Sequence, residues 1–259
     1  MSKEVSLARS AQEQFGRQAR FYAESDAHRG GENLYALAAY AALGRYGMVV
    51  DLGTGAGFTA FALAPYSKYV LAMDIAPGML AQTRRLASER GVSNVGLLMA
   101  EAKSLPFATG SLDAVSCRHA AHHFHDLPGA MGEIRRVLKP GAVFVLSDSV
   151  APEGDYEASW MNDVEVRRDA THQMDLRPSG WRSLLANVGL EITHWSMAKV
   201  YLEFNNWVRR SATPREKIEC LRRDFLSAPA SVVGAFGIQP ESGAINFHWD
   251  ALVLRAVKQ

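Results

Sequence analysis

The feature that most restricts the fold of this chain is a run of glycines directly after a short apolar segment. Residues 49–57 read Val-Val-Asp-Leu-Gly-Thr-Gly-Ala-Gly. The apolar residues predict a buried strand over Met48–Leu52. The glycines over Gly53–Gly57 allow a tight turn into a helix over Phe58–Pro65. This order of strand, glycine turn and helix is typical of an α/β fold with a parallel sheet.

The alternation of strand and helix continues along the rest of the chain. It predicts a doubly wound, Rossmann-like α/β fold with a seven-stranded, mostly parallel sheet. The further strands are expected at Tyr69–Met73, Gly96–Met99, Leu112–Ser116, Ala142–Ser147, Leu190–Leu202 and Ala244–Val257. The further helices are expected at Pro77–Gly91, Pro128–Leu138, Asp155–Met174, Ser179–Val188 and, as a pair, within Phe204–Ser227.

The charge of the chain is nearly balanced, since 28 lysines and arginines face 27 aspartates and glutamates. This balance excludes a broadly electropositive nucleic-acid binder and makes a small molecule the expected partner. The two cysteines, Cys117 and Cys220, match neither a disulfide framework nor a zinc ribbon and suit a reducing compartment. Because no stretch approaches about 18 consecutive apolar residues, and no apolar leader begins the chain, we expect a cytoplasmic protein with no membrane span.

The glycine turn lacks the residues that two common phosphate-binding loops require. The dinucleotide fingerprint needs a third glycine at position 58, where this chain has Phe58, and this disfavours a nicotinamide oxidoreductase. A P-loop is excluded because no Gly-Lys-Ser/Thr follows the turn. Asp51 instead places a carboxylate beside the loop, which repels a pyrophosphate and favours a ligand with positive charge. Taken alone, a glycine-rich turn between a strand and a helix is often only a tight turn with no ligand.

A second carboxylate narrows the kind of ligand. Asp74 follows Asp51 by 23 residues and ends the second expected strand, where this fold places an acid against ribose hydroxyls. An adenosine with a cationic tail and no phosphate fits both carboxylates, and S-adenosyl-L-methionine has this form. The sequence therefore predicts S-adenosyl-L-methionine as the cofactor and S-adenosyl-L-homocysteine as its product.

Four motifs follow one another between residues 51 and 141. They read Asp-Leu-Gly-Thr-Gly-Ala-Gly at 51–57, Ala-Met-Asp-Ile at 72–75, Ala-Glu-Ala-Lys-Ser-Leu-Pro-Phe at 100–107 and Glu-Ile-Arg-Arg-Val-Leu-Lys-Pro-Gly at 133–141. In these motifs the chain resembles the class I S-adenosylmethionine-dependent methyltransferases, specifically the ubiquinone/menaquinone-biosynthesis-type branch (methyltransferase domain 11). We expect a helical cover over residues 1–46, the cofactor-binding core over 47–150, and the rest of the same domain with a helical cap over 151–259.

The resemblance also implies which residues contact the cofactor. It implies that Asp51, Gly53 and Gly55 contact the methionine end of the cofactor, and that Asp74 binds both ribose hydroxyls. The other implied contacts are Ile75 and Met79 over the adenine, Glu101 and Ala102 at its edge, Tyr22 over the carboxylate, and Thr54 and Arg118 elsewhere in the site. Aspartate is common in the family at the position of Glu101, so this contact departs from the family pattern.

Four of the eight histidines lie within residues 118–126, directly after the fourth expected strand. The carboxyl ends of the strands open onto the ligand crevice of this fold, so the segment is expected to face the transferable methyl. A histidine with an ordinary pKa near about 6.5 is suited to take a proton there, and His122 is the preferred base. His123 is a second candidate, although it and Asp126 would equally brace the turn. A metal site is disfavoured because no cysteine or glutamate completes a ligand set.

The segments after residue 151 are expected to close over the crevice as a cap. His172 ends the expected helix Asp155–Met174, and closure would bring it towards His122 as a third catalytic candidate. The sequence thus predicts methyl transfer to an oxygen or carbon of a small, apolar or aromatic acceptor. The alternative is a protein of the same fold that uses the cofactor for cyclisation or only senses it, and a protein acceptor stays open.

Overall fold

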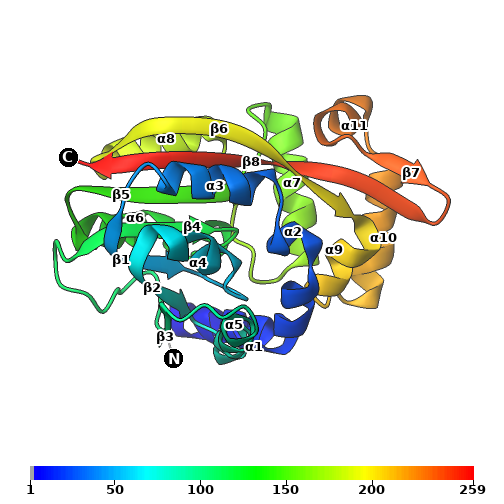
Figure 1. Cartoon of the computed structure of the whole chain (residues 1–259). Coiled ribbons are helices and arrows are strands. Elements are labelled where there is room, and N and C mark those ends of the chain that lie inside the picture. Colours follow the sequence, from blue (N-terminus) through cyan, green and yellow to red (C-terminus); the bar gives the residue numbers. More distant parts are fainter. Residues whose placement is uncertain (1–2) are drawn as a thin grey trace.

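The computed structural model describes residues 3–259, with side chains from residue 11 onwards, and shows a mostly parallel sheet surrounded by helices (Figure 1). Within these residues the sheet has eight strands in the order β3-β2-β1-β4-β5-β8-β6, with β7 paired to β8. Strands β1 to β5 run parallel, whereas β8 is antiparallel to both β5 and β6. The predicted fold class is confirmed. The strands are β1 (Tyr46–Leu52), β2 (Ser67–Asp74), β3 (Val95–Met99), β4 (Leu112–Arg118), β5 (Leu138–Ser149), β6 (Leu190–Glu203), β7 (Gln239–Glu241) and β8 (Ala244–Lys258).

The strand order places a ligand crevice at the ends of β1, β2 and β4. From β1 the chain adds β2 and β3 on one side of the sheet and β4 and β5 on the other. Ligands of doubly wound folds bind at such a reversal, outside the carboxyl ends of the strands. Asp74 ends β2, Arg118 ends β4, and the glycine turn follows β1. The topology therefore gathers the predicted site residues at one edge.

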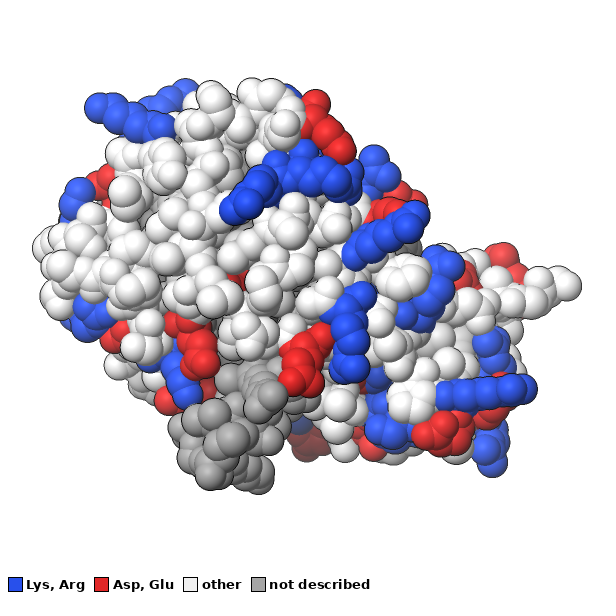
Figure 2. Space-filling view, turned by 90° about the horizontal axis from the view of Figure 1, so that it is seen from below, with Lys and Arg blue, Asp and Glu red and all other residues white. Residues whose placement is uncertain are grey.

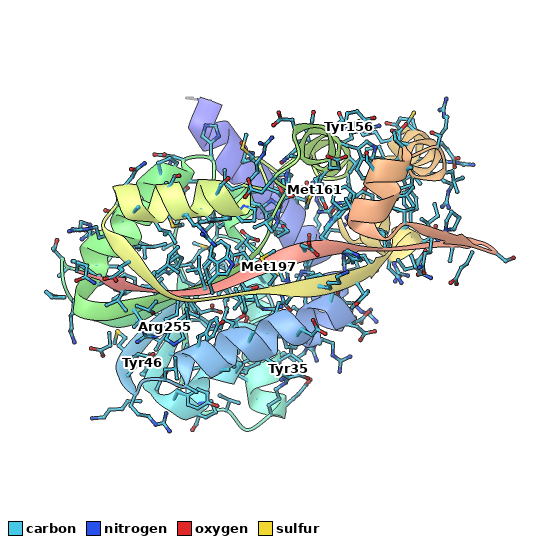
Figure 3. All side chains as sticks on the ribbon, turned by 90° about the horizontal axis from the view of Figure 1, so that it is seen from above. Tyr35, Tyr46, Tyr156, Met161, Met197 and Arg255 are labelled. Carbon is cyan, nitrogen blue, oxygen red and sulfur yellow. The ribbon has the colours of Figure 1, made fainter. Side chains whose placement is uncertain are left out.

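The helices form layers on both faces of the sheet. Helices α3 and α8 cover opposite faces of the long strands β6 and β8 (Figure 3). Helix α1 packs on α5 near β3 (Figure 1). The helices are α1 (Lys3–Glu24), α2 (Asp26–Arg29), α3 (Glu32–Ala41), α4 (Phe58–Leu63), α5 (Pro77–Glu89), α6 (Leu127–Val137), α7 (Asp155–Arg168), α8 (Pro178–Asn187), α9 (Phe204–Arg210), α10 (Arg215–Leu226) and α11 (Ala230–Phe236).

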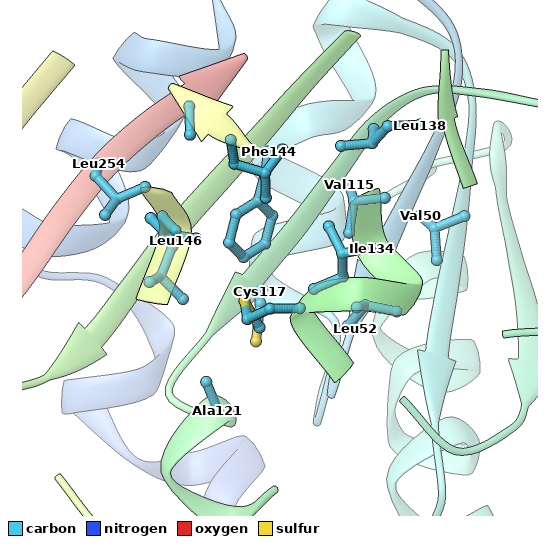
Figure 4. Close-up of a cluster of buried hydrophobic side chains, with 14 of the residues drawn as sticks. Val50, Leu52, Val115, Cys117, Ala121, Ile134, Leu138, Phe144, Leu146 and Leu254 are labelled. Atoms are coloured by element: carbon cyan, nitrogen blue, oxygen red, sulfur yellow. The ribbon is translucent and has the colours of Figure 1, made fainter. Parts of the chain in front are cut away.

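The main apolar core lies against the central strands. Phe144 and Leu146 of β5, Val115 of β4 and Ile134 of α6 belong to one fully buried cluster (Figure 4). Val143 and Val145 point to the opposite face, where they join a second cluster with Leu37 and Ala41 of α3. Because both faces are covered, β5 is apolar at successive positions and does not alternate.

A separate aromatic cluster stabilises the cap. Strands β6 and β8 extend beyond the rest of the sheet and carry α7, α9, α10 and α11 (Figure 1). The ring of Trp207 lies 5.4 Å from that of Phe225, and the rings of Phe236 and Trp249 lie 4.7 Å apart. The cap therefore has an apolar core of its own, built on two strands of the main sheet.

The structure differs from the expected elements in a few places. Helix α7 ends at Arg168, not at residue 174, because Asp169 turns the chain by accepting hydrogen bonds from the backbone and side chain of Thr171. His172 consequently lies in the irregular segment between α7 and α8. Pro65 converts the end of the expected helix after β1 into a 3₁₀ turn. Two elements were not expected, helix α11 and the short, exposed strand β7. Because of β7, the sheet has eight strands where seven were expected.

Charges of both signs are mixed over the face that is seen from below, where α1 and α5 lie (Figure 2). This mixture agrees with the near balance of 28 basic and 27 acidic residues. In residues 3–259, no helix is long and apolar enough to cross a bilayer.

Candidate active site

The glycine turn after β1 uses the left-handed backbone conformation that its sequence allows. Gly53, Gly55 and Gly57 have φ angles of 61°, 56° and 90°. A Cβ added at Gly53 would lie 2.4 Å from the Cβ of Ala120, whereas one added at Gly55 would meet nothing within 4 Å. The turn is thus tightly packed under the segment after β4 at Gly53 and open at Gly55.

We expect Gly53→Ala to destabilise the protein more than Gly55→Ala. Both variants force alanine into the left-handed region, at a cost of about 1–2 kcal/mol. Only Gly53→Ala adds a clash, with Ala120, which costs about 1–3 kcal/mol more. Chemical denaturation of the cofactor-free proteins measures the difference, with Gly55→Ala as the matched control. Equal losses would contradict the close packing at Gly53.

Asp51 holds the glycine turn against β4. Its Oδ1 accepts a hydrogen bond from the Ser116 hydroxyl at 2.7 Å, and its Oδ2 accepts one from the Thr54 hydroxyl at 2.6 Å. Burial raises the pKa of Asp51 to about 6, although both hydroxyls oppose the rise. The side chain does not line the large cavity described next. Its expected contact with the methionine end therefore stays a prediction, and its observed bonds are to the turn.

A large cavity of about 310 Å³ lies outside the ends of β1, β2 and β4, within the size range of ligand pockets. Its lining includes residues from the N-terminal helices, from the strand ends and from the segment after α7. Of the eleven expected cofactor contacts, all except Asp51 line it: Tyr22, Gly53, Thr54, Gly55, Asp74, Ile75, Met79, Glu101, Ala102 and Arg118.

Asp74 presents a buried carboxylate to this cavity. Its Oδ2 accepts a hydrogen bond from the backbone N–H of Gly55 at 2.9 Å, and its Oδ1 accepts one from that of Ala76 at 2.9 Å. Burial raises the pKa of Asp74 to about 6 against the effect of these donors. Each carboxylate oxygen has two lone pairs, so Asp74 keeps acceptor capacity for ligand hydroxyls.

Arg118 supplies the complementary charge. Its Nε donates to the Thr59 hydroxyl at 2.9 Å and its Nη2 to the carbonyl of His28 at 2.5 Å, but its buried Nη1 has no partner among the residues that the structure describes. Burial lowers the pKa of Arg118 to about 10. A carboxylate in the large cavity would satisfy this donor. These residues together fit the expected cofactor. Asp74 is able to accept hydrogen bonds from hydroxyl groups, Arg118 is able to donate to a carboxylate, and Ile75 and Met79 offer an apolar surface.

A second, smaller space of about 70 Å³ adjoins the large cavity, and we call it the inner chamber. Four residues line both spaces and form what we call the ring boundary: Tyr22, His28, His119 and His123. His119 has a φ of 52°, which is unusual for a non-glycine residue. Asn33 holds it there by a side-chain contact of 2.6 Å to Nε2. Burial lowers the pKa of His119 and of His28 well below the ordinary value, so both rings are uncharged.

His122 lines the inner chamber and forms a close pair with Asp148 of β5. Its Nδ1 lies 2.6 Å from Asp148 Oδ1, and its backbone N–H donates to Oδ2 at 2.9 Å. Burial acts to lower the pKa of His122, but the charge and hydrogen bond of Asp148, with the charges of Asp175 and Glu165, raise it to about 9. The pairing directs Nδ1–H to Asp148 and leaves Nε2 as the available ring nitrogen. The pKa of His122 therefore differs from the ordinary value that was expected from the sequence.

The other two histidine candidates lie beside His122. The ring centroid of His123 is 4.1 Å and that of His172 is 5.4 Å from that of His122, so the cap brings all three together. Burial, with the charge of His122, lowers the pKa of His123 to about 3, and burial also lowers the pKa of His172. His123 contacts the Thr171 hydroxyl at 3.2 Å, and Asp126 caps α6 by accepting from Gly129. Within the part of the chain that the structure describes, no three histidine, cysteine or acidic side chains are grouped as metal ligands.

Several buried charges of the inner chamber were not among the sequence candidates. Glu165 accepts hydrogen bonds from the indoles of Trp207 and Trp249 and from Arg168. Asp148 carried a usable signal, because it ends an apolar strand as Asp51 and Asp74 do. Glu165 carried no such signal, since a charged residue in an isolated helix is normally exposed.

Comparisons with known proteins point to one family. Residues 50–146 match the model of the methyltransferase domain. The uncharacterized methyltransferase YcgJ of Bacillus subtilis is 30% identical over 250 residues, which cover 95% of this chain and 98% of YcgJ. A demethylmenaquinone methyltransferase of Thermus thermophilus is 41% identical over 107 residues, which cover 40% of this chain and 48% of that protein.

A solved structure extends the likeness over the cap. The crystal structure of BH2331 from Bacillus halodurans superposes with a TM-score of 0.82 at 32% identity, covering 88% of this chain and 99% of that chain. The match therefore extends well beyond residues 50–146, the segment that the domain model covers.

Proposed function

The chain belongs to the class I S-adenosylmethionine-dependent methyltransferases, and on this premise we propose that it methylates an oxygen or carbon of a small acceptor bound in the inner chamber. One observation carries the proposal. The chamber that holds the His122–Asp148 pair adjoins the large cavity that holds Asp74 and Arg118, and the ring boundary lies between them. On this proposal the methyl group is transferred between the two spaces at the ring boundary.

The large cavity is the proposed site of S-adenosylmethionine, which supplies an electrophilic methyl group on a sulfonium. Asp74 would accept hydrogen bonds from the ribose hydroxyls, and Arg118 Nη1 would donate to the carboxylate. Ile75 and Met79 would cover the adenine, with Glu101 and Ala102 at its edge. The proposed site is completed by Tyr22, Gly53, Thr54 and Gly55 along the methionyl chain, with Asp51 positioning the turn.

The inner chamber is the proposed site of acceptor activation. His122 Nε2 would take the proton from the acceptor's O–H or acidic C–H while Nδ1–H stays bonded to Asp148. The new bond joins the acceptor atom to the methyl carbon, and the bond that breaks leaves its electron pair on sulfur. His123 and His172 are proposed to position the acceptor, because both rings are uncharged and border His122. Alignment at about 3–3.5 Å between reacting atoms is the main requirement of such a transfer.

Calorimetry and mass spectrometry test the proposal. We expect S-adenosylhomocysteine to bind with a Kd of about 1 μM, or about −8 kcal/mol. Incubation with S-adenosylmethionine and a panel of small phenols, organic acids and enolisable carbonyl compounds is expected to add one CH₂ unit to at least one acceptor. Absence of cofactor binding would overturn the assignment of the large cavity.

The same experiment separates the alternative function. A compound that is rearranged or cyclised without a gain in mass would favour a non-methylating use of the fold. Cofactor binding with no change in any small molecule, but with a labelled protein in a mixture, would favour a protein acceptor.

A further inference from the structure

Arg210, at the end of α9, is a half-buried cation that forms no ion pair with the side chains that the structure describes. It lines the inner chamber, and its Nη1 donates to the Ser25 hydroxyl at 2.8 Å. Among the side chains that the structure describes, no carboxylate lies within ion-pairing distance of it. Burial, with the like charge of Arg168, lowers the pKa of Arg210 to about 10, although Tyr22 and Glu165 act to raise it, and Arg210 stays charged at neutral pH.

Two buried acids near the inner chamber, Glu165 and Asp169, have other hydrogen-bond partners, whereas Glu24, Asp26 and Glu203 line the outer groove. Glu165 is bonded to Arg168 and to two indoles. Asp169 accepts hydrogen bonds from Gln14, Thr171 and the Ser211 hydroxyl. Arg210 is half-buried and its side-chain hydrogen bond is to a neutral hydroxyl, so its positive charge favours an anion that binds at the inner chamber.

The position of Arg210 makes an incoming acceptor the natural source of that anion. With Ala27 and Leu202, Arg210 lines both the inner chamber and an outer groove of about 890 Å³. It does not line the large cavity, where Arg118 is available for the cofactor's carboxylate. Among the described residues, the large cavity and the inner chamber are therefore each lined by one guanidinium that forms no ion pair, that of Arg118 and that of Arg210.

We propose that the methyl acceptor is a compact organic acid whose carboxylate binds Arg210. This inference rests on the proposed function and adds the substrate class. The chamber of about 70 Å³ has room for roughly five water-sized groups. Val200, Leu202, Trp207 and Trp249 supply apolar walls for the body of the acid. With its carboxylate at the outer wall, the acid directs its other end towards His122 and the ring boundary.

Binding of simple acids to the protein saturated with S-adenosylhomocysteine tests the proposal. Acetate and butyrate are each compared with their uncharged amides by ligand-observed NMR titration. At least one acid is expected to bind about tenfold or more tightly than its amide. Arg210→Gln is expected to remove this preference and Arg210→Lys to restore part of it. Arg209→Gln is the matched control, since Arg209 lines only the outer groove and is expected to leave the preference unchanged.

The outcomes separate the two proposals. If the wild-type protein fails to bind S-adenosylhomocysteine, the proposed function fails. If it binds S-adenosylhomocysteine but shows no preference for any acid over its amide, or if Arg210→Gln keeps the preference, the inference about the acceptor fails alone. Should Arg210→Gln not fold, as judged by its melting temperature, the ratio of acid to amide affinity in the wild type and in Arg210→Lys decides.

Discussion

Replacement of His122 by asparagine is expected to lower turnover on the acceptor found by mass spectrometry by about 10²–10⁴-fold. Asparagine places an N–H where Nδ1 lies, so the hydrogen bond to Asp148 is retained, while Nε2 is removed. Because His122 does not line the large cavity, the Kd of S-adenosylhomocysteine is expected to change by less than about threefold. Single-turnover kinetics and calorimetry on the same preparation measure the two quantities.

His194 provides the matched control for this substitution. It is exposed on β6, and its Nδ1 contacts the Thr193 hydroxyl at 3.1 Å. His194→Asn is expected to leave both turnover and cofactor affinity unchanged. Full turnover in His122→Asn would show that the acceptor loses its proton without this residue.

The pH dependence of turnover follows from the pairing of His122 with Asp148. The pKa of His122 is raised to about 9, so at pH 7 roughly one ring in a hundred is unprotonated and able to accept a proton. If His122 is the base, turnover rises about tenfold per pH unit from pH 7 and levels off above about 9. Asp148→Asn removes the main cause of the raised pKa and is expected to move the rise to lower pH. A rate that falls between pH 7 and 9 would mean that the protonated form of His122 is the active one.

The fold was predictable because its strands are covered on both faces. The apolar runs of β1, β4 and β5 and the glycines after β1 reflect local requirements that a sequence states directly. The end of α7 was not predictable in this way. Asp169 stops that helix through its hydrogen bonds to Thr171, Ser211 and Gln14, and two of these partners are distant in sequence.

The candidate site also contains features that the local sequence predicts and features that depend on distant contacts. Asp74 and the glycine turn follow from their places at strand ends. Asp148 is the main cause of the raised pKa of His122, and Arg210 lines the inner chamber, yet each acts only together with residues that the fold brings near it. A pKa of about 9, where an isolated imidazole has about 6.5, is therefore a tertiary property that the histidine-rich segment by itself does not reveal.

Replacement of Asp74 by alanine is expected to weaken the binding of S-adenosylhomocysteine by about 100-fold or more. Two hydroxyl hydrogen bonds to a buried carboxylate contribute about 1.5–3 kcal/mol each, and the variant loses both. Asp74 also accepts the backbone N–H of Gly55, so its removal releases the glycine turn as well. Asp113→Asn is the matched control, because Asp113 pairs with Lys139 and does not line the large cavity.

The two effects of Asp74 are separable with a modified ligand. The 2′-deoxy analogue of S-adenosylhomocysteine lacks one of the hydroxyls that Asp74 would bind. In the wild-type protein this loss is expected to weaken binding by about tenfold, whereas in Asp74→Ala the two ligands are expected to bind equally, since the partner of that hydroxyl is already absent. An equal penalty in both proteins would assign the whole effect of Asp74 to support of the glycine turn, and would remove the ribose from its proposed contacts.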